Sequence, residues 1–183
     1  MFSFSTIVST AVMLASVGAY ATPVARSTCS PNAQGAPVSI VSADHWRDLK
    51  WGDANSPPVN GDVIIGASTA LPVHVSQSGQ FPTSYIIKDA TNNNGLAVST
   101  TYGNRLILDT ASDTGTEANQ LFDIACQTCG TDTTPGNAAG SSCTISPQGD
   151  SNACVRAGDN GSPLTVVECD WHGFDAQLFN IVF

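Results

Sequence analysis

The phrase Gln-Leu-Phe-x-Ile occurs twice in the sequence, first at Gln120 and again at Gln177. Its apolar residues alternate, at Phe122 and Ile124 in the first copy, and such alternation is typical of a β-strand with one buried face. A strand phrase that recurs indicates an internal repeat, and a repeat restricts the possible folds more than any single motif does. The two copies therefore provide a register for comparing the rest of the chain.

The strand pattern around the two phrases is repeated as well. Short β-branched runs separated by Gly, Asn, Asp and Pro recur along the chain, and no long window has the apolar spacing of a helix. Four strands are expected at residues 85–89, 96–99, 105–109 and 120–124, and the same order returns at 143–145, 153–156, 164–169 and 177–181. A fainter copy at 38–41, 46–51, 63–65 and 73–75 has lost the Gln and the Phe.

Three units of four strands predict an all-β domain of twelve short strands with pseudo-threefold symmetry. The expected units cover about residues 36–77, 83–126 and 142–183. The outer strands of each unit would form the wall of a barrel, and the middle two a hairpin that caps one end. Closure leaves no strand edge free to pair with another chain. The repeated phrase then closes a unit, so Phe122, Ile124, Phe179 and Ile181 are predicted core residues.

This pattern resembles the ricin-type β-trefoil lectins. In that family each subdomain ends in Gln-x-Trp or Gln-x-Phe, and a cysteine that opens strand two is often bridged to one that closes strand three. Gln-Leu-Phe at 120–122 and 177–179 matches the first feature, and the placement of Cys154 and Cys169 matches the second. The resemblance implies a single β-trefoil domain over residues 22–183 and a disulfide between Cys154 and Cys169.

Residues 1–21 are expected to be a signal peptide rather than part of the fold. The segment is uncharged, rich in apolar and small residues, and ends in the small-x-small pattern Ala19-Tyr20-Ala21. A membrane anchor is the alternative, but the segment barely reaches bilayer length and is rich in Ser, Thr, Ala and Gly. The sequence therefore predicts a secreted, extracellular protein without membrane insertion.

Six cysteines follow that segment, and an even number in an oxidising compartment indicates disulfides rather than a zinc cluster or a redox pair. In a trefoil, Cys126 ends one unit and Cys143 begins the next, so Cys143 is expected to bond either Cys126 or Cys129. Cys29 takes whichever of these remains. Residues 130–142, rich in Gly, Thr and Ser, are predicted to be a flexible loop held at both ends by these cysteines.

Charge and motif content exclude several functions. A net charge of −9, with only six Lys and Arg, argues against nucleic acid and anionic membranes as partners. The histidines, His45, His74 and His172, have no metal-ligand spacing, so no metal or cofactor is expected. Gly-x-Ser-x-Gly and P-loop motifs are missing. A surface loop also gives too little burial to raise the pKa of one carboxyl group of a pair, as a catalytic acid requires. The protein is therefore expected not to be an enzyme, a small hydrolase being the weakest of the readings.

The resemblance implies where a sugar would bind. In the family, an Asp on strand two and an Asn before the Gln bind sugar hydroxyls, and an aromatic residue after strand three stacks on the ring. In the second unit Asn119 matches the Asn, but Ser99 stands where the Asp would be. In the third unit Arg156 replaces the Asp and Ala176 the Asn.

The third unit nevertheless has the best-placed residues for stacking and polar contacts. Trp171 follows Cys169 closely, as a stacking aromatic would, although a buried loop plug is its alternative role. Arg156 has a structural alternative too, pairing with Asp159 or Asp175. In the first unit Asp48 and Trp51 could play the sugar-binding roles, but Trp46 and Trp51 are expected in the core. The candidate carbohydrate-binding residues are Arg156, Asp170, Trp171, His172, Asp175 and Asn119.

Together these features predict a non-catalytic carbohydrate-binding or lectin-derived recognition module, with a glycan or glycoprotein as partner. The alternative is a secreted protein-binding β-trefoil, such as a protease inhibitor, that uses the loops at 53–61 and 130–142. Asn160-Gly161-Ser162 is a glycosylation sequon at an expected hairpin tip, although the following Pro163 disfavours its use.

Overall fold

The computed structural model describes residues 28–44, 48–79, 83–112, 114–170 and 175–183. The predicted signal peptide lies outside these ranges. Within them the chain forms thirteen β-strands and two short 3-10 helices. None of the helices in the described part is long and apolar enough to span a bilayer.

The strands fall into three successive sets of four, with one short addition. The first set is β1 (Ser39–Ser42), β2 (Lys50–Asp53), β3 (Ile64–Ala67) and β4 (Val73–Gln77). The second is β5 (Tyr85–Asp89), β6 (Leu96–Thr100), β7 (Leu106–Thr110) and β8 (Phe122–Ala125), with η1 (Ala118–Gln120) before β8. The third is β10 (Ala138–Pro147), β11 (Ala153–Arg156), β12 (Thr165–Glu168) and β13 (Phe179–Val182), with η2 (Asp175–Gln177) before β13. The short β9 (Thr128–Cys129) pairs with β10.

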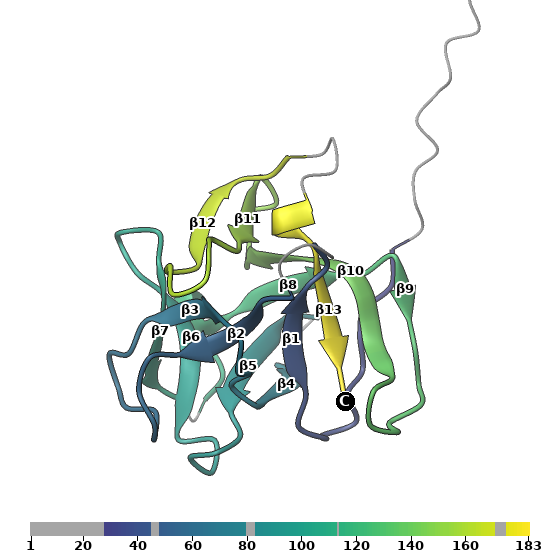
Figure 1. The fold of residues 1–183 in the computed structure, drawn as a ribbon, viewed down its shortest axis with the longest axis horizontal. Coiled ribbons are helices and arrows are strands. Elements are labelled where there is room, and N and C mark those ends of the chain that lie inside the picture. The colour runs from purple at the N-terminus through teal and green to yellow at the C-terminus, as the bar shows by residue number, and fades with distance from the viewer. Residues whose placement is uncertain (1–27, 45–47, 80–82, 113, 171–174) are drawn as a thin grey trace, which may run out of the picture.

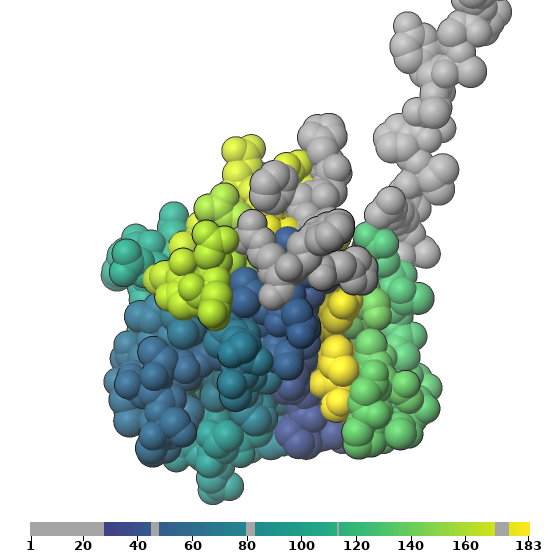
Figure 2. Space-filling view, viewed as in Figure 1, coloured from purple at the N-terminus to yellow at the C-terminus, as the bar shows by residue number. Residues whose placement is uncertain are grey.

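The first and last strands of each set close a six-stranded barrel. Going round it, β1 pairs with β13, β13 with β10, β10 with β8, β8 with β5, and β5 with β4. An antiparallel bridge between Val38 and Val73 joins β4 back to β1 and completes the ring. Figure 1 shows this arrangement, and in Figure 2 β13 lies as a yellow stripe between β1 and the green β10. The predicted all-β, β-trefoil fold is confirmed.

The strand register carries the threefold symmetry down to single residues. Ser42 faces Phe179, and the equivalent pairs join Asp89 to Val73 and Pro147 to Phe122. Buried core residues follow at matching positions of the three units: Ile40, Ile87 and Ile145 on the first strands, and Val75, Ile124 and Ile181 on the last. The burial predicted for Phe122, Ile124, Phe179 and Ile181 is confirmed.

The three central hairpins, β2–β3, β6–β7 and β11–β12, join one another near the symmetry axis. The Leu164 N–H donates to the Ile64 carbonyl at 2.9 Å, and the Leu106 N–H donates to the Leu164 carbonyl at 3.2 Å. The Leu108 N–H donates to the Asp62 carbonyl at 2.7 Å. Because Ile64, Leu106 and Leu164 are all fully buried, the hairpins share one core with the barrel.

The predicted flexible loop at residues 130–142 is wrong for its last five residues, which belong to β10. There Ala138 pairs with Val182 and Gly140 with Ile181, so this segment supplies the partner that β13 needs. Glycine is required because a Cβ at position 140 would lie 2.5 Å from the Sγ of Cys126. Small residues suit flexible loops as well as tightly packed strands, so composition alone does not distinguish the two.

Three disulfides join the cysteines. They link Cys154 to Cys169, Cys126 to Cys143 and Cys29 to Cys129, with Cα separations of 4.9, 3.8 and 6.1 Å. The first is the bridge that the resemblance implies, and the second selects one of the two partners left open for Cys143. These bridges are compatible with an extracellular protein.

Candidate functional site

The glutamine of the repeated phrase anchors the loop that joins the third and fourth strands of a unit. In the second unit the Gln120 Oε1 accepts a hydrogen bond from the Ser112 N–H at 2.9 Å. Its Nε2 donates to the Thr110 carbonyl at 2.8 Å. Since Gln120 is only 3% exposed, both ends of its amide are satisfied by the chain itself.

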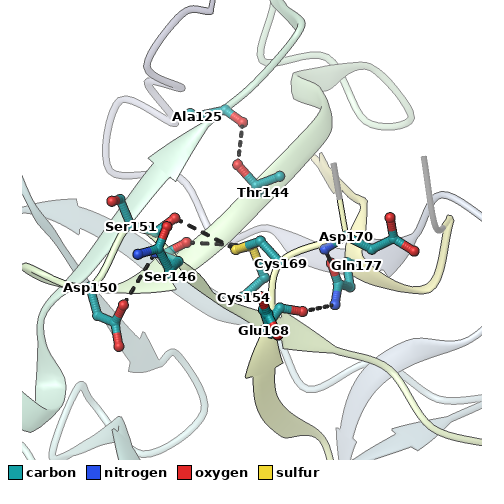
Figure 3. Close-up of a disulfide and its surroundings, with 11 residues drawn as sticks. Ala125, Thr144, Ser146, Asp150, Ser151, Cys154, Glu168, Cys169, Asp170 and Gln177 are labelled. Atoms are coloured by element: carbon teal, nitrogen blue, oxygen red, sulfur yellow. Dashed lines mark hydrogen bonds between the residues drawn. A yellow bond between two sulfur atoms is a disulfide. The ribbon is translucent and has the colours of Figure 1, made fainter. Parts of the chain in front are cut away.

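Gln177 repeats these contacts in the third unit. Its Oε1 accepts from the Asp170 N–H at 2.7 Å, and its Nε2 donates to the Glu168 carbonyl at 2.9 Å, beside the Cys154–Cys169 disulfide (Figure 3). Gln177 is 5% exposed. Both glutamines lie in a 3-10 turn before the strand, so their expected place in the strand was wrong. Gln177 thus fixes the end of the chain segment that follows β12, at Glu168 and Asp170.

The first unit has no such glutamine because it has no long loop to hold. Only residues 68–72 separate β3 from β4, whereas residues 111–121 separate β7 from β8. Leu71 takes the place of the glutamine, is buried, and donates its N–H to the Trp51 carbonyl at 2.8 Å. The faintness of this repeat in the sequence therefore reflects a shorter connection.

Hairpin register makes Gly52, Ser99 and Arg156 equivalent, since they pair with Ile65, Ile107 and Thr165. This is the strand-two position at which the family resemblance requires an aspartate. No carboxylate occupies it in any unit. At Gly52 a side chain would meet the Ala67 Cβ and lie 2.8 Å from the Thr69 carbonyl oxygen. The first unit therefore has no room for one.

In the second unit the candidate residue Asn119 is occupied within the protein. Its Nδ2 donates to the Ser99 Oγ at 2.8 Å, and Ser99 is 1% exposed. The Asn119 carbonyl accepts from the Thr100 Oγ1 at 3.4 Å. Asn119 and Ser99 stand at two positions that bind sugar hydroxyls in the lectin family, and here they bind each other.

The third unit presents its candidates from two elements. Arg156 is the exposed last residue of β11, and Asp170 is exposed just after β12 with its N–H held by Gln177. Ala176, in η2, lies next to the end of β11, where its carbonyl accepts a hydrogen bond from the Ala157 N–H at 2.8 Å. Trp171 and His172 lie outside the described residues, as does the side chain of Asp175. The sequon residue Asn160 is exposed in the turn between β11 and β12.

The described residues also form a groove in the first unit, which the sequence did not single out as a carbohydrate site. It encloses about 380 Å³ between the loop after β2, the short connection from β3 to β4, and the turn after β5. The residues that line it are Asp53, Ala54, Asn55, Ser56, Pro58, Thr69, Ala70, Leu71, Pro72 and Thr91. The sequence signal for it is the clustering of polar and proline residues at 53–58, within the loop that is predicted as a protein contact.

Asp53 is the charged group of this first-unit groove. Its Oδ1 accepts from the Asn55 N–H at 3.1 Å, while its Oδ2 is buried without a hydrogen-bond partner among the described residues. Asp62 is held nearby, accepting from the Asn55 Nδ2 at 2.5 Å and the Val59 N–H at 2.7 Å. Partial burial, and then the charge of Asp62, raise the pKa of Asp53 above its usual value of 3.8. A side-chain hydrogen bond between Asp53 and Asp62 raises the pKa in the same direction, so the two carboxyl groups lie together at the groove.

Trp51 is a core residue, as predicted. It is 2% exposed and packs edge-on against Phe179, with the ring centroids 5.5 Å apart. It therefore cannot stack on a sugar. No group of three or more metal-ligating side chains gathers in the part of the chain that the structure describes.

Comparisons with known proteins bear on the fold. No protein-family description and no curated protein matches the sequence. One similar solved structure comes from work on the structure and mode of action of a mosquitocidal holotoxin, with a TM-score of 0.58 and 13% identity. That match covers 81% of this chain but only 17% of the toxin chain.

The designed threefold-symmetric protein ThreeFoil is similar too, with a TM-score of 0.56 and 13% identity over 80% of this chain and 98% of its own. At such identities the likeness concerns the fold alone. Together with the register described above, it establishes the chain as a β-trefoil.

Proposed function

We propose that the protein is a secreted, non-catalytic module that recognises carbohydrate. The observation that carries this proposal is the first-unit groove, where the Asp53 carboxyl group adjoins amide, hydroxyl and apolar groups. The repeated glutamines, the three disulfides and the signal-like segment at residues 1–21 support the same proposal.

The groove has the mixed chemistry that a sugar ring requires. The Asp53 carboxyl group would accept a hydrogen bond from one ring hydroxyl, and the neighbouring Asn55 Oδ1 would accept one from a second. Thr91 is held in place by hydrogen bonds of 2.8 and 2.7 Å from its N–H and Oγ1 to Asp89. Leu71 and Pro72 supply an apolar wall for the ring carbons. The third-unit surface with Trp171 remains our second proposed locus.

A glycan array tests the proposal, with three variants compared against the unaltered protein. We expect Asp53→Asn to weaken binding of the recognised glycan about tenfold, because charged hydrogen bonds contribute more than neutral ones. Trp171→Ala should weaken it only if the third unit also binds. Asp132→Asn, which removes a carboxylate from an exposed turn far along the chain, is the matched control. An array without any bound glycan would refute the proposal.

A protein-binding role is the second candidate, and the hydrogen bonds that order the loop at residues 53–61 favour it. The Asp62 carboxylate accepts from the Val59 N–H at 2.7 Å, and the Asn60 Nδ2 donates to the Thr110 Oγ1 at 2.8 Å. Val59 is 52% exposed on this preorganised loop. Titration against a panel of proteases tests this role: inhibition that Val59→Asp abolishes would support it, and the absence of inhibition would count against it.

A further inference from the structure

The packing of the central hairpins brings two arginines into one row. Arg105, just before β7, forms an antiparallel bridge with Thr165 at the start of β12. On its other side Thr165 pairs with Arg156, the last residue of β11. Residues that face each other across antiparallel strands project from the same side of a sheet. Arg105, Thr165 and Arg156 therefore share one face and are called the arginine row below.

The arginine row faces solvent. Its neighbours along the three strands, Leu106, Leu164 and Val155, are fully buried and so occupy the opposite face. Both arginines are exposed, and the threonine between them is half-buried. Facing residues lie about 5 Å apart at Cβ, so roughly 10 Å separates the two arginines at Cβ. Their long side chains can therefore meet over a single group placed above the Thr165 hydroxyl.

Backbone hydrogen bonds hold the row in place. The Leu106 N–H donates to the Leu164 carbonyl at 3.2 Å, and the Val166 N–H donates to the Asn104 carbonyl at 2.8 Å, on either side of the bridge between Arg105 and its partner. Because these contacts are between separate units of the trefoil, the row exists only in the folded chain. A ligand would meet a site whose backbone is already ordered.

A second threonine lies at the outer end of the row, and its hydroxyl is engaged within the protein: the Thr101 Oγ1 donates to the Arg105 carbonyl at 3.3 Å and accepts from the Gly103 N–H at 3.3 Å. Thr101 donates its N–H to the Arg105 carbonyl at 3.0 Å, which extends the hairpin by one pair beyond Leu106 and Thr100. The carboxylate that shares this face of β7, Asp109, accepts from the Thr110 N–H at 2.7 Å and the Asn60 Nδ2 at 3.3 Å. This face therefore presents two guanidinium groups and the Thr165 hydroxyl, and Asp109 on the same face of β7 is held by other donors.

We propose that the arginine row binds a single carboxylate or sulfate group carried by a saccharide. Guanidinium groups bind both anions through paired, charge-assisted hydrogen bonds, and the Thr165 hydroxyl suits a sugar hydroxyl beside them. A net charge of −9 opposes an extended polyanion, so one acidic group on a sugar fits better than a nucleic acid. This inference rests on the proposed carbohydrate-binding function, but it uses residues other than those of the first-unit groove.

Calorimetric titration of the purified protein tests the proposal with four probes: galacturonic acid, galactose 6-sulfate, neutral galactose and inorganic sulfate. We expect the acidic saccharides to bind more tightly than galactose and than sulfate alone. Arg105→Gln and Arg156→Gln should each weaken that binding about tenfold, with Arg→Lys at either position recovering only part of it. Binding should weaken as salt is added. Comparison of the uronate probe with the sulfated probe shows whether the row prefers a carboxylate or a sulfate group.

Lys88→Gln is the matched control, because it removes the same charge from β5, away from the row. The proposal is overturned if both arginine variants bind the acidic saccharides as tightly as the unaltered protein, or if Lys88→Gln weakens binding as much. It is also overturned if inorganic sulfate binds as tightly as the saccharides. If both arginine variants still bind neutral glycans, the proposed carbohydrate-binding function holds, and the arginine row is not needed for it. A protein that binds no saccharide at all would refute both.

Discussion

At the scale of single residues, the repeated glutamine has a structural rather than a ligand-binding role. Gln120 and Gln177 each satisfy one backbone donor and one backbone acceptor at the end of the third strand. Leu71 stands at the same position where the connection is short. The side chain is therefore retained where a long loop must be fastened to the barrel.

Replacing Gln120 by Ala should lower the free energy of unfolding by about 2–3 kcal/mol, because it leaves the Thr110 carbonyl and the Ser112 N–H without their partner. Denaturant unfolding measures this change. The exposed Gln127 provides the control, since Gln127→Ala should change stability by less than about 0.5 kcal/mol. Equal effects of the two substitutions would contradict an anchoring role.

Asp53 predicts a dependence of stability on pH. Its pKa is raised in the folded protein by burial and by Asp62, so the fold favours the protonated carboxyl group. Its stabilising contribution is thus present below the unfolded value of 3.8 and is lost as pH rises through the folded pKa. Asp53→Asn imitates the protonated form and should raise the melting temperature at pH 7 but not at pH 3, as measured by thermal unfolding.

Asp132 should show the opposite dependence of stability on pH. The Thr134 Oγ1 and N–H donate to its carboxylate at 2.6 and 2.9 Å, and these bonds lower the pKa of Asp132 below 3.8. Its contribution is therefore present above pH 3.8 and lost as the pH falls. If Asp53→Asn and Asp132→Asn shift the pH profile in the same direction, the assignment for Asp53 is incorrect.

At the scale of elements, β10 shows how a disulfide and a strand restrict one another. Gly140 lies against the Sγ atoms of Cys126 and Cys143, where a Cβ would come within 2.5 and 2.8 Å of sulfur. The same residue pairs with Ile181 of β13. A side chain at this position must displace either the disulfide or the strand.

We therefore expect Gly140→Ala to destabilise the protein by about 1–3 kcal/mol through overpacking. Peptide mapping of the unreduced protein, combined with denaturant unfolding, would show whether the disulfide or only the strand is disturbed. Ser141→Ala is a suitable control, because it makes a small change at the next position of the same strand. A Gly140→Ala protein as stable as the control would show that the strand yields without cost.

At the scale of the whole molecule, the barrel and its three hairpins form one cooperative unit. The ring of strand pairs is completed between β1 and β4, and the hairpins join through Ile64, Leu106 and Leu164. Each of these contacts links parts of the chain far apart in sequence. No unit is complete without the other two.

Hydrogen exchange should reveal this cooperativity. The amides of Leu106, Leu108 and Leu164 donate to carbonyls of other units from the buried axis, so they should exchange only by global unfolding. The Gly136 amide, which donates to the Phe183 carbonyl on an exposed turn, should exchange through local opening and much faster. Mass spectrometry or NMR follows the exchange. Comparable exchange rates for the leucine amides and the Gly136 amide would contradict a single cooperative core.

Local sequence was a good guide to the strands and a poor guide to the ligand sites. A strand with alternating burial shows its period in a few residues, which is why β5 and β11 were located at their observed bounds. The first-unit groove could not be read in this way, because its lining comes from three separate segments. The internal bond between Asn119 and Ser99 was hidden for the same reason.

The sequence alone determined the repeated four-strand unit and the residues that fill its core, because apolar period and turn residues are local properties. The tertiary structure decided which strands meet across units, and with them the partner of Cys143, the strand character of residues 138–142, and the row formed by Arg105 and Arg156. These features depend on contacts between distant segments, and such contacts exist only once the barrel has closed.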